Sequence, residues 1–203
     1  MKFIKPKILI ITCIVCLLPI FLGVAVWDKL PDTMAIHFDI NNNPDNFASK
    51  RFVVFVLPLL MVLLQIFCCF INDVNSYRYG ERRKFERVTK WIIPVITVIL
   101  QISTLGYGLG WNLDIRRVAG IIVAAVFLVI GNYLPKFDYI KNCDMDTEKA
   151  RKINRFIGIE TVVMGVLFLI SLFLPPIATV ICLFLMIPYV IISVIYGIRI
   201  GRK

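Results

Sequence analysis

The chain has 203 residues, of which 59% are hydrophobic, and its mean hydropathy is +0.84. Soluble domains are about half apolar, so this composition excludes an ordinary soluble protein. The formal net charge of +10 would suit nucleic acid binding if the cations lay on one folded surface, but several short loops share them, so we expect no direct nucleic acid partner.

Six apolar stretches come close to the roughly 20 helical residues that cross a bilayer. They cover residues 8–27, 52–71, 91–109, 118–134, 156–174 and 177–198. Pro175 and Pro176 separate the last two stretches, because proline interrupts helical hydrogen bonding. The polar segments between the stretches are all shorter than the roughly 50 residues of an independent domain. We therefore predict an all-α membrane protein with a single six-helix domain over residues 1–203.

The Lys and Arg residues are distributed unevenly between the two sides of this topology. One side carries five of the 23, at Lys29, Lys50, Arg51, Arg116 and Arg117, and the other side carries the remaining 18. Because basic loops stay on the cytoplasmic side, we expect a multi-pass protein of the cell membrane with both termini in the cytoplasm. The cytoplasmic cations would also contact the head groups of membrane lipids.

The first apolar stretch has some features of a cleaved signal peptide. Its start is basic, and Gly23-Val24-Ala25 offers the small residues of a cleavage site. The apolar run is long, however, and continues to Trp27, which suits an anchor at the membrane interface. We expect a retained span.

The loop between the first two spans has internal order. Ile36, Phe38 and Ile40 alternate with polar residues, which predicts a short extended segment with one apolar and one polar face. The run Asn41-Asn42-Asn43-Pro44-Asp45 that follows is typical of a turn. We expect a structured external loop that folds back on the membrane domain.

Two motifs resemble those of a known family. The external loop contains Leu30-Pro31-Asp32, then Ile36-His37-Phe38, then a turn ending in Pro44-Asp45, and then Ser49-Lys50. The end of the fourth span reads Ile130-Gly131-Asn132-Tyr133-Leu134-Pro135-Lys136. Together with the six spans, these motifs are similar to those of the bacterial SdpI family, whose members carry an N-terminal domain of unknown function.

The resemblance implies an immunity protein that protects its producer against a secreted toxic peptide. It also implies a signalling receptor that holds a transcriptional repressor at the membrane. Family members usually follow the second motif with a Gly-Ile-Arg-Thr-Pro-Trp-Thr element, which residues 137–152 lack. That loop is the natural docking surface for a repressor, so the departure bears on the signalling role more than on immunity.

The resemblance further implies that His37, Asp45 and Lys50 shape a ligand-binding surface on the external loop. Asp39 joins this set, because an extended segment would place it on the same face as His37. The alternatives are a hydrogen-bonded loop histidine without a ligand, or a metal or pH-sensing site with Asp32 or Asp45. We expect no metal and no cofactor, since a single histidine with scattered carboxylates is a weak ligand set.

Four polar residues lie inside the predicted spans. Glu160 is the only acidic one, and Asn132 lies near the same end of the preceding span, so we predict a hydrogen bond between them across the helix interface. Gln65 and Gln101 lie well inside the second and third spans. Each is expected to bond to a neighbouring helix, although together they could instead line a polar cavity.

Two other functional classes compete with immunity. A small transporter for a peptide or an ion would need a polar pathway, for which Glu160 and Pro94 are the available candidates. An intramembrane enzyme would need a reactive constellation, and the sequence offers neither a Ser-His-Asp grouping nor a His-Glu-x-x-His motif. We therefore expect a protein that is not an enzyme.

Overall fold

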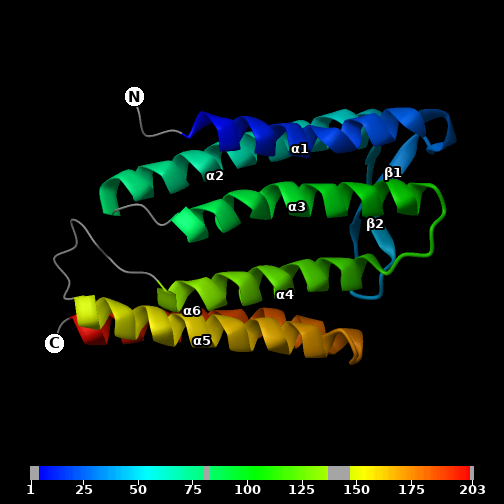
Figure 1. Ribbon diagram of the computed structural model, residues 1–203. Coiled ribbons are helices and arrows are strands. Elements are labelled where there is room, and N and C mark those ends of the chain that lie inside the picture. The colour runs from blue at the N-terminus through cyan, green and yellow to red at the C-terminus, as the bar shows by residue number, and fades with distance from the viewer. Residues whose placement is uncertain (1–4, 80–82, 137–146, 202–203) are drawn as a thin grey trace. The chain divides into compact units, whose positions relative to one another are not determined.

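The computed structural model describes residues 5–79, 83–136 and 147–201 (Figure 1). Six helices in these ranges are long and apolar enough to cross a membrane, which confirms the predicted number of spans. They are α1 (Pro6–Ala25), α2 (Leu57–Tyr79), α3 (Arg83–Gly108), α4 (Ile115–Tyr133), α5 (Thr147–Ser171) and α6 (Pro176–Gly201).

Three helices extend well beyond the predicted spans. α2 continues to Tyr79, α3 begins at Arg83 and α5 begins at Thr147, each about two turns into a polar segment. An apolar run marks only the part of a helix suited to hydrocarbon, whereas backbone hydrogen bonding continues through the polar residues next to it. Pro176 stands at the first position of α6, where a helix needs no amide donor.

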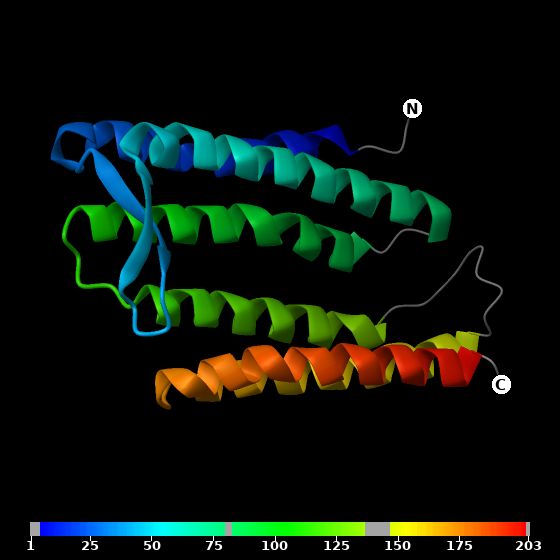
Figure 2. The same ribbon diagram turned by 180° about the vertical axis from the view of Figure 1, so that it is seen from behind.

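The described residues are mainly helical, as predicted, and the two strands both lie in the loop between α1 and α2. A short 3-10 turn, η1 (Trp27–Lys29), leads into two antiparallel strands, β1 (Thr33–Phe38) and β2 (Pro44–Ser49). Figure 2 shows this hairpin crossing the end of the α1–α3 group. The predicted extended segment and turn are therefore confirmed, and pairing of the extended segment with β2 completes a hairpin.

The chain enters α2 through one wide helical turn, the π-helix η2 (Phe52–Val56). Val53 and Val54 in this turn are fully buried. A Cβ atom on Gly23 of α1 would lie 2.7 Å from a methyl carbon of Val54, so the glycine permits this close packing. The turn thus joins the hairpin to the helices through tightly packed side chains.

The described residues form two compact units, which are considered one at a time. Unit 1 comprises Met1–Tyr77 and Arg83–Val118, and unit 2 comprises Arg78–Arg82 and Ala119–Lys203. In unit 1, α1 packs along α3, and β1 contacts α3. A buried apolar cluster of Leu30, Met34, Val53, Val54 and Leu105 joins the hairpin to the helices.

In unit 2, α4 and α5 make close contacts at small residues. A Cβ atom on Gly131 of α4 would lie 2.8 Å from the backbone oxygen of Gly158 in α5. Two turns along, a Cβ atom on Gly165 would lie 3.1 Å from the backbone oxygen of Ala124. The two helices therefore approach each other through small residues, as membrane helices commonly do.

Candidate functional site

The candidate site is the hairpin, whose turn is fixed by three asparagines and Asp39. The Oδ1 atom of Asp39 accepts hydrogen bonds from the backbone amides of Asn41, at 2.9 Å, and Asn43, at 2.7 Å. Asn42 adopts a positive φ of 67°, which asparagine tolerates better than most residues. The Asn43 amide and, to a smaller extent, its side chain hold the pKa of Asp39 below its ordinary value.

The tip of the hairpin is fastened to the start of α4. The side-chain oxygen of Asn42 accepts a hydrogen bond from the Ile115 amide at 2.8 Å, and its amide group donates to the Leu113 carbonyl at 3.1 Å. The first amides of a helix lack intrahelical partners, so Asn42 supplies a cap from a distant part of the chain. This contact confirms that the loop folds back on the helices.

The inner face of the hairpin is apolar, but its pattern differs from the predicted alternation. Met34 and Ala35 are buried, and the Phe38 ring packs edge-on against Tyr107 with 4.8 Å between ring centroids. Irregularities in strand pairing interrupt the register on both sides of His37. A bulge shifts the faces of a strand, so Ile36 points outward and is 38% exposed, against our prediction.

Of the four predicted ligand-binding residues, the structure brings two together. The Nδ1 atom of His37 lies 2.5 Å from Oδ1 of Asp45, and both side chains are exposed. Asp39 is engaged with the turn and does not join them. Lys50 pairs with Asp32 at 2.9 Å and lies 5.1 Å from the centre of the Trp27 ring.

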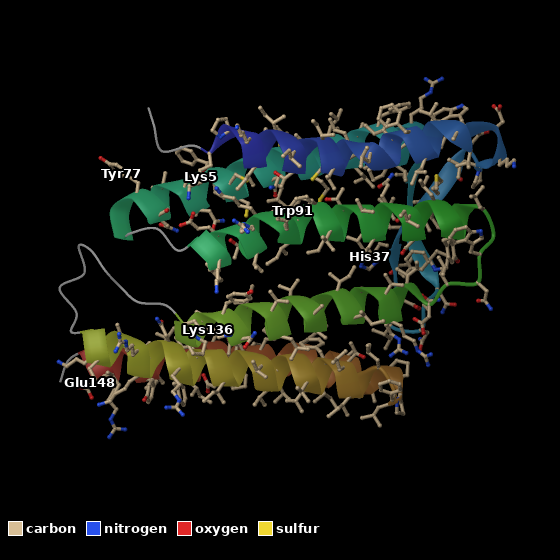
Figure 3. All side chains as sticks on the ribbon, viewed as in Figure 1. Lys5, His37, Tyr77, Trp91, Lys136 and Glu148 are labelled. Carbon is tan, nitrogen blue, oxygen red and sulfur yellow. The ribbon has the colours of Figure 1, made fainter. Side chains whose placement is uncertain are left out.

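Two apolar side chains on the same hairpin are exposed, which the sequence did not indicate. Phe47 is 55% exposed and Ile40 is 49% exposed, and both lie on the segment that carries the His37–Asp45 pair. Figure 3 shows His37 beside the strands, at the end of unit 1 opposite Lys5 and Tyr77. The hairpin thus presents charged and apolar groups together, a combination that suits an amphipathic partner.

The two predicted intramembrane glutamines bond to neighbouring helices. The fully buried Gln65 donates to the Thr12 hydroxyl of α1 at 2.8 Å and to the Lys90 carbonyl of α3 at 2.9 Å. Gln101 donates to the Val53 carbonyl in the wide turn η2 at 2.7 Å. These bonds confirm the role of the glutamines as links between helices.

The predicted hydrogen bond between Asn132 and Glu160 is wrong. The Asn132 oxygen accepts a bond from Lys136 of the following turn at 3.2 Å, whereas Glu160 accepts a bond from Ser193 of α6 at 2.8 Å. Gly131, beside Asn132, packs against α5 instead, and the next residue along a helix points about 100° away. Asn132 therefore faces outward, where no bond to α5 is available.

An ionic cluster in unit 1 was also missed. Lys90 of α3 pairs with Asp73 of α2, and each side chain is 1% exposed. Lys5 adds a bond from its backbone amide to the second Asp73 oxygen at 3.2 Å and an ion pair with Glu86 at 2.8 Å. The sequence places these two opposite charges at facing ends of consecutive spans, but Lys90 was counted only among the 18 basic residues of one side.

The second family motif acts in the packing of unit 2. A Cβ atom on Gly158 would lie 2.6 Å from Cγ of Pro135, and Gly131 meets the same glycine. The motif therefore fixes the approach of α4 to α5. Residues 137–146, which include most of the loop where the chain departs from the family, lie outside the described residues. In the described ranges, no group of three or more His, Cys, Asp or Glu side chains could hold a metal ion.

The hairpin lies in a segment of the chain that matches a known protein family model. Residues 14–62 match the family model of a domain of unknown function, DUF1648, and this segment contains the hairpin. The chain is also similar to the Immunity protein SdpI of Bacillus subtilis (strain 168), with 26% identity over 122 residues. That alignment covers 60% of this chain and 56% of the relative, so the chain matches little more than half of the relative's length. No solved structure matches the chain. These two similarities confirm the resemblance to the SdpI family that the motifs indicated.

Proposed function

We propose that this chain is an immunity protein that protects the cell producing it against a secreted, membrane-active killing peptide. The observation that carries the proposal is the exposed hairpin within the DUF1648 segment of a chain similar to a protein named for immunity. The proposed protein acts by binding and carries out no catalysis. Its ligand is a peptide, and it needs no cofactor.

The proposal places the hairpin outside the cell. The uneven distribution of Lys and Arg supports cytoplasmic termini, and with them an external loop between α1 and α2. A secreted peptide would then meet the hairpin before it reaches the hydrocarbon. The short hydrogen bonds of Asn42 and Asp39 hold the hairpin in one conformation, which lowers the entropic cost of binding.

The chemistry of the hairpin supports a membrane-active partner. Such peptides are amphipathic, with apolar residues on one face and charged residues on the other. Phe47 and Ile40 offer apolar contacts, and His37 with Asp45 offers hydrogen bonds and charge. Lys50 is turned toward Asp32 and Trp27. We therefore propose that Lys50 stabilises the hairpin surface and does not itself contact the peptide.

Two further roles that the sequence suggested receive no support from the described residues. Repressor binding rests on the family resemblance, and transport rests on Glu160 and Pro94. Pro94 is fully buried, and Glu160 is bonded to Ser193. Protection by binding is therefore the function proposed for the site.

A survival assay tests the proposal. A sensitive bacterial strain expresses the wild-type chain or the variant His37→Ala/Asp45→Ala and is challenged with a secreted killing peptide. We expect survival with the wild type and roughly tenfold greater sensitivity with the variant, as a loss of about 1.4 kcal/mol in binding would give. The His37–Asp45 pair is exposed, so its removal changes folding little and the assay reports recognition.

The matched control removes another exposed ion pair. Glu148 and Lys152 of α5 lie 2.8 Å apart and are also exposed, and the variant Glu148→Gln/Lys152→Gln should protect as well as the wild type. Membrane abundance of all three chains is measured by immunoblot. Equal protection by both variants would contradict a role for the hairpin, and no protection by the wild type would contradict the proposed function.

A further inference from the structure

An open groove lies between α5 and α6 in unit 2, and the proposed function does not use it. Its walls are apolar and include Val163 and Leu167 of α5 and Leu185 and Ile192 of α6. The cavity has a volume of about 410 Å³, which lies in the range of small-ligand sites. Both helices are long and apolar enough to cross a membrane, so the groove is suited to a ligand that shares the bilayer.

One end of the groove carries a carboxylate that is only partly satisfied. Oε2 of Glu160 accepts the Ser193 hydroxyl at 2.8 Å, and the other oxygen has no hydrogen bond within the described ranges. No described cation lies within ion-pair distance of Glu160. Pro188, also in the groove, removes the amide that would bond to the Phe184 carbonyl. Tyr189, also in the groove, shares a hydrogen bond with the Thr161 hydroxyl at 2.8 Å. Among the described residues, the second Glu160 oxygen therefore remains an acceptor without a donor.

The position of Glu160 along the helices favours a ligand that reaches in from the interface. Arg155 precedes it by five residues on α5, and Arg199 follows Ser193 by six residues on α6, at the same end of the antiparallel pair (Figure 1). Both arginines are exposed and have no ion pair among the described residues. A ligand here would meet an anion inside the groove and cations nearer the helix ends.

We infer that this groove binds an aminophospholipid, with its primary ammonium group at Glu160 and an acyl chain along the apolar walls. The ammonium supplies the N–H donors that the carboxylate lacks, and Arg155 or Arg199 supplies charge for the phosphate. A choline head group carries the same charge but has no N–H to donate, so it satisfies the site less well. This inference does not depend on the proposed function.

Charge argues against a second copy of the chain as the occupant. In a two-fold dimer built across this groove, the same patches would face each other and bring two Glu160 carboxylates together. Like charges at membrane depth oppose such an interface. An apolar peptide with a basic residue would match the charge, but a secreted peptide approaches from outside, whereas Glu160 lies toward the predicted cytoplasmic end.

Lipid titration followed by native mass spectrometry tests the inference. The purified full chain in detergent is titrated with phosphatidylethanolamine and with phosphatidylcholine of identical acyl chains. We expect the wild type to bind phosphatidylethanolamine roughly tenfold more tightly, as one charge-assisted hydrogen bond allows. Glu160→Gln should reduce this preference to less than about twofold. Val163→Phe, which fills the groove, should weaken binding of both lipids.

Glu148→Gln is the matched control, because it makes the same chemical change on an exposed part of the same helix. It should keep the preference of the wild type. Equal binding of the two lipids by the wild type, or an unchanged preference in Glu160→Gln, would overturn the inference. Binding of a lysine-bearing apolar peptide without a lipid preference, or a dimer mass without bound lipid, would assign the groove to another occupant and would also overturn it.

Discussion

The two units of this protein solve the problem of joining membrane helices in different ways. Unit 1 links α1, α2 and α3 through buried polar groups, above all the Lys90–Asp73 pair and the bonds of Gln65. Unit 2 brings α4 and α5 together through small residues such as Gly131 and Gly158. Polar bonds fix particular atoms, whereas small residues fix the distance between backbones.

Unit 1 contains the hairpin, and this explains its use of polar bonds between helices. Unit 1 must hold two strands against helix ends, and its polar bonds give the three helices one register. Unit 2 carries no strand in its described part and leaves an open groove between α5 and α6. We expect unit 1 to be sensitive to substitutions of its buried polar residues, and the α4–α5 contact of unit 2 to be sensitive to substitutions of its glycines.

The largest expected effect comes from breaking the buried ion pair of unit 1. Lys90→Met leaves Asp73 as an uncompensated buried charge and should lower the free energy of unfolding by about 3–5 kcal/mol. Unfolding in mixed detergent micelles measures this change. The double variant Asp73→Asn/Lys90→Met should be less destabilised than Lys90→Met alone, because no buried charge remains.

The control for this prediction is Lys152→Met, which removes the same side chain from an exposed pair on α5. It should change the free energy of unfolding by no more than about 1 kcal/mol. Equal effects of Lys90→Met and Lys152→Met on the free energy of unfolding would show that the buried pair stabilises unit 1 no more than an exposed pair would.

The next effect comes from a close contact between the backbones of α4 and α5 in unit 2. A Cβ atom on Gly131 would lie 2.8 Å from backbone atoms of Gly158 and Val162, which cannot move aside as a side chain can. Gly131→Ala should therefore lower the free energy of unfolding by about 1–3 kcal/mol. Gly197→Ala is the control, since nothing lies within 4 Å of its added Cβ, and it should not destabilise the chain. If Gly131→Ala left the free energy of unfolding unchanged, the close contact of α4 and α5 would not be what stabilises unit 2.

A smaller effect is expected at Gln65. Gln65→Leu removes the bonds to Thr12 and to the Lys90 carbonyl while keeping most of the volume. Hydrogen bonds between membrane helices contribute about 0.6 kcal/mol each on average, so the loss should be about 1 kcal/mol. Unfolding of Gln65→Leu and Thr12→Val, separately and combined, measures how strongly the two residues are coupled. Purely additive effects would indicate that the bond contributes no coupling.

The smallest effect concerns the hairpin turn and its response to pH. Hydrogen bonds from Asn43 lower the pKa of Asp39 in the folded chain. The stabilisation of the turn by ionised Asp39 is therefore complete above the ordinary pKa of about 3.9. It is lost as the pH falls through the lower pKa of the folded state. The Asn43 amide signal in NMR should therefore shift with a midpoint below 3.9, and Asp39→Asn should abolish the shift. A midpoint above 3.9 would contradict the hydrogen-bonded turn.

The sequence predicted the six helices because length and hydropathy determine where a chain can cross a bilayer. It predicted the hairpin less fully. The alternation around Phe38 indicated an extended segment, but the bulges beside His37 depend on pairing with β2, which no local pattern reveals. This is why Ile36 was placed on the wrong face.

The polar contacts were the hardest to predict. Lys90 looked like a loop cation, since hydropathy does not show that Asp73 lies beside it in the folded chain. The predicted partner of Glu160 was wrong because only the depth of Asn132 in the membrane was considered. Gly131, not Asn132, lies on the face of α4 that contacts α5. His37 and Asp45 were assigned to one surface through the family motif, and the structure does bring them together.

Survival of a sensitive strain under peptide challenge is the first test of the proposed immunity function. Cells that carry this chain are compared with cells that carry the empty vector, at a peptide concentration that kills the latter. We expect the chain to raise the lethal concentration and His37→Ala/Asp45→Ala to cancel most of this gain. Identical lethal concentrations with and without the wild-type chain in the membrane would contradict it.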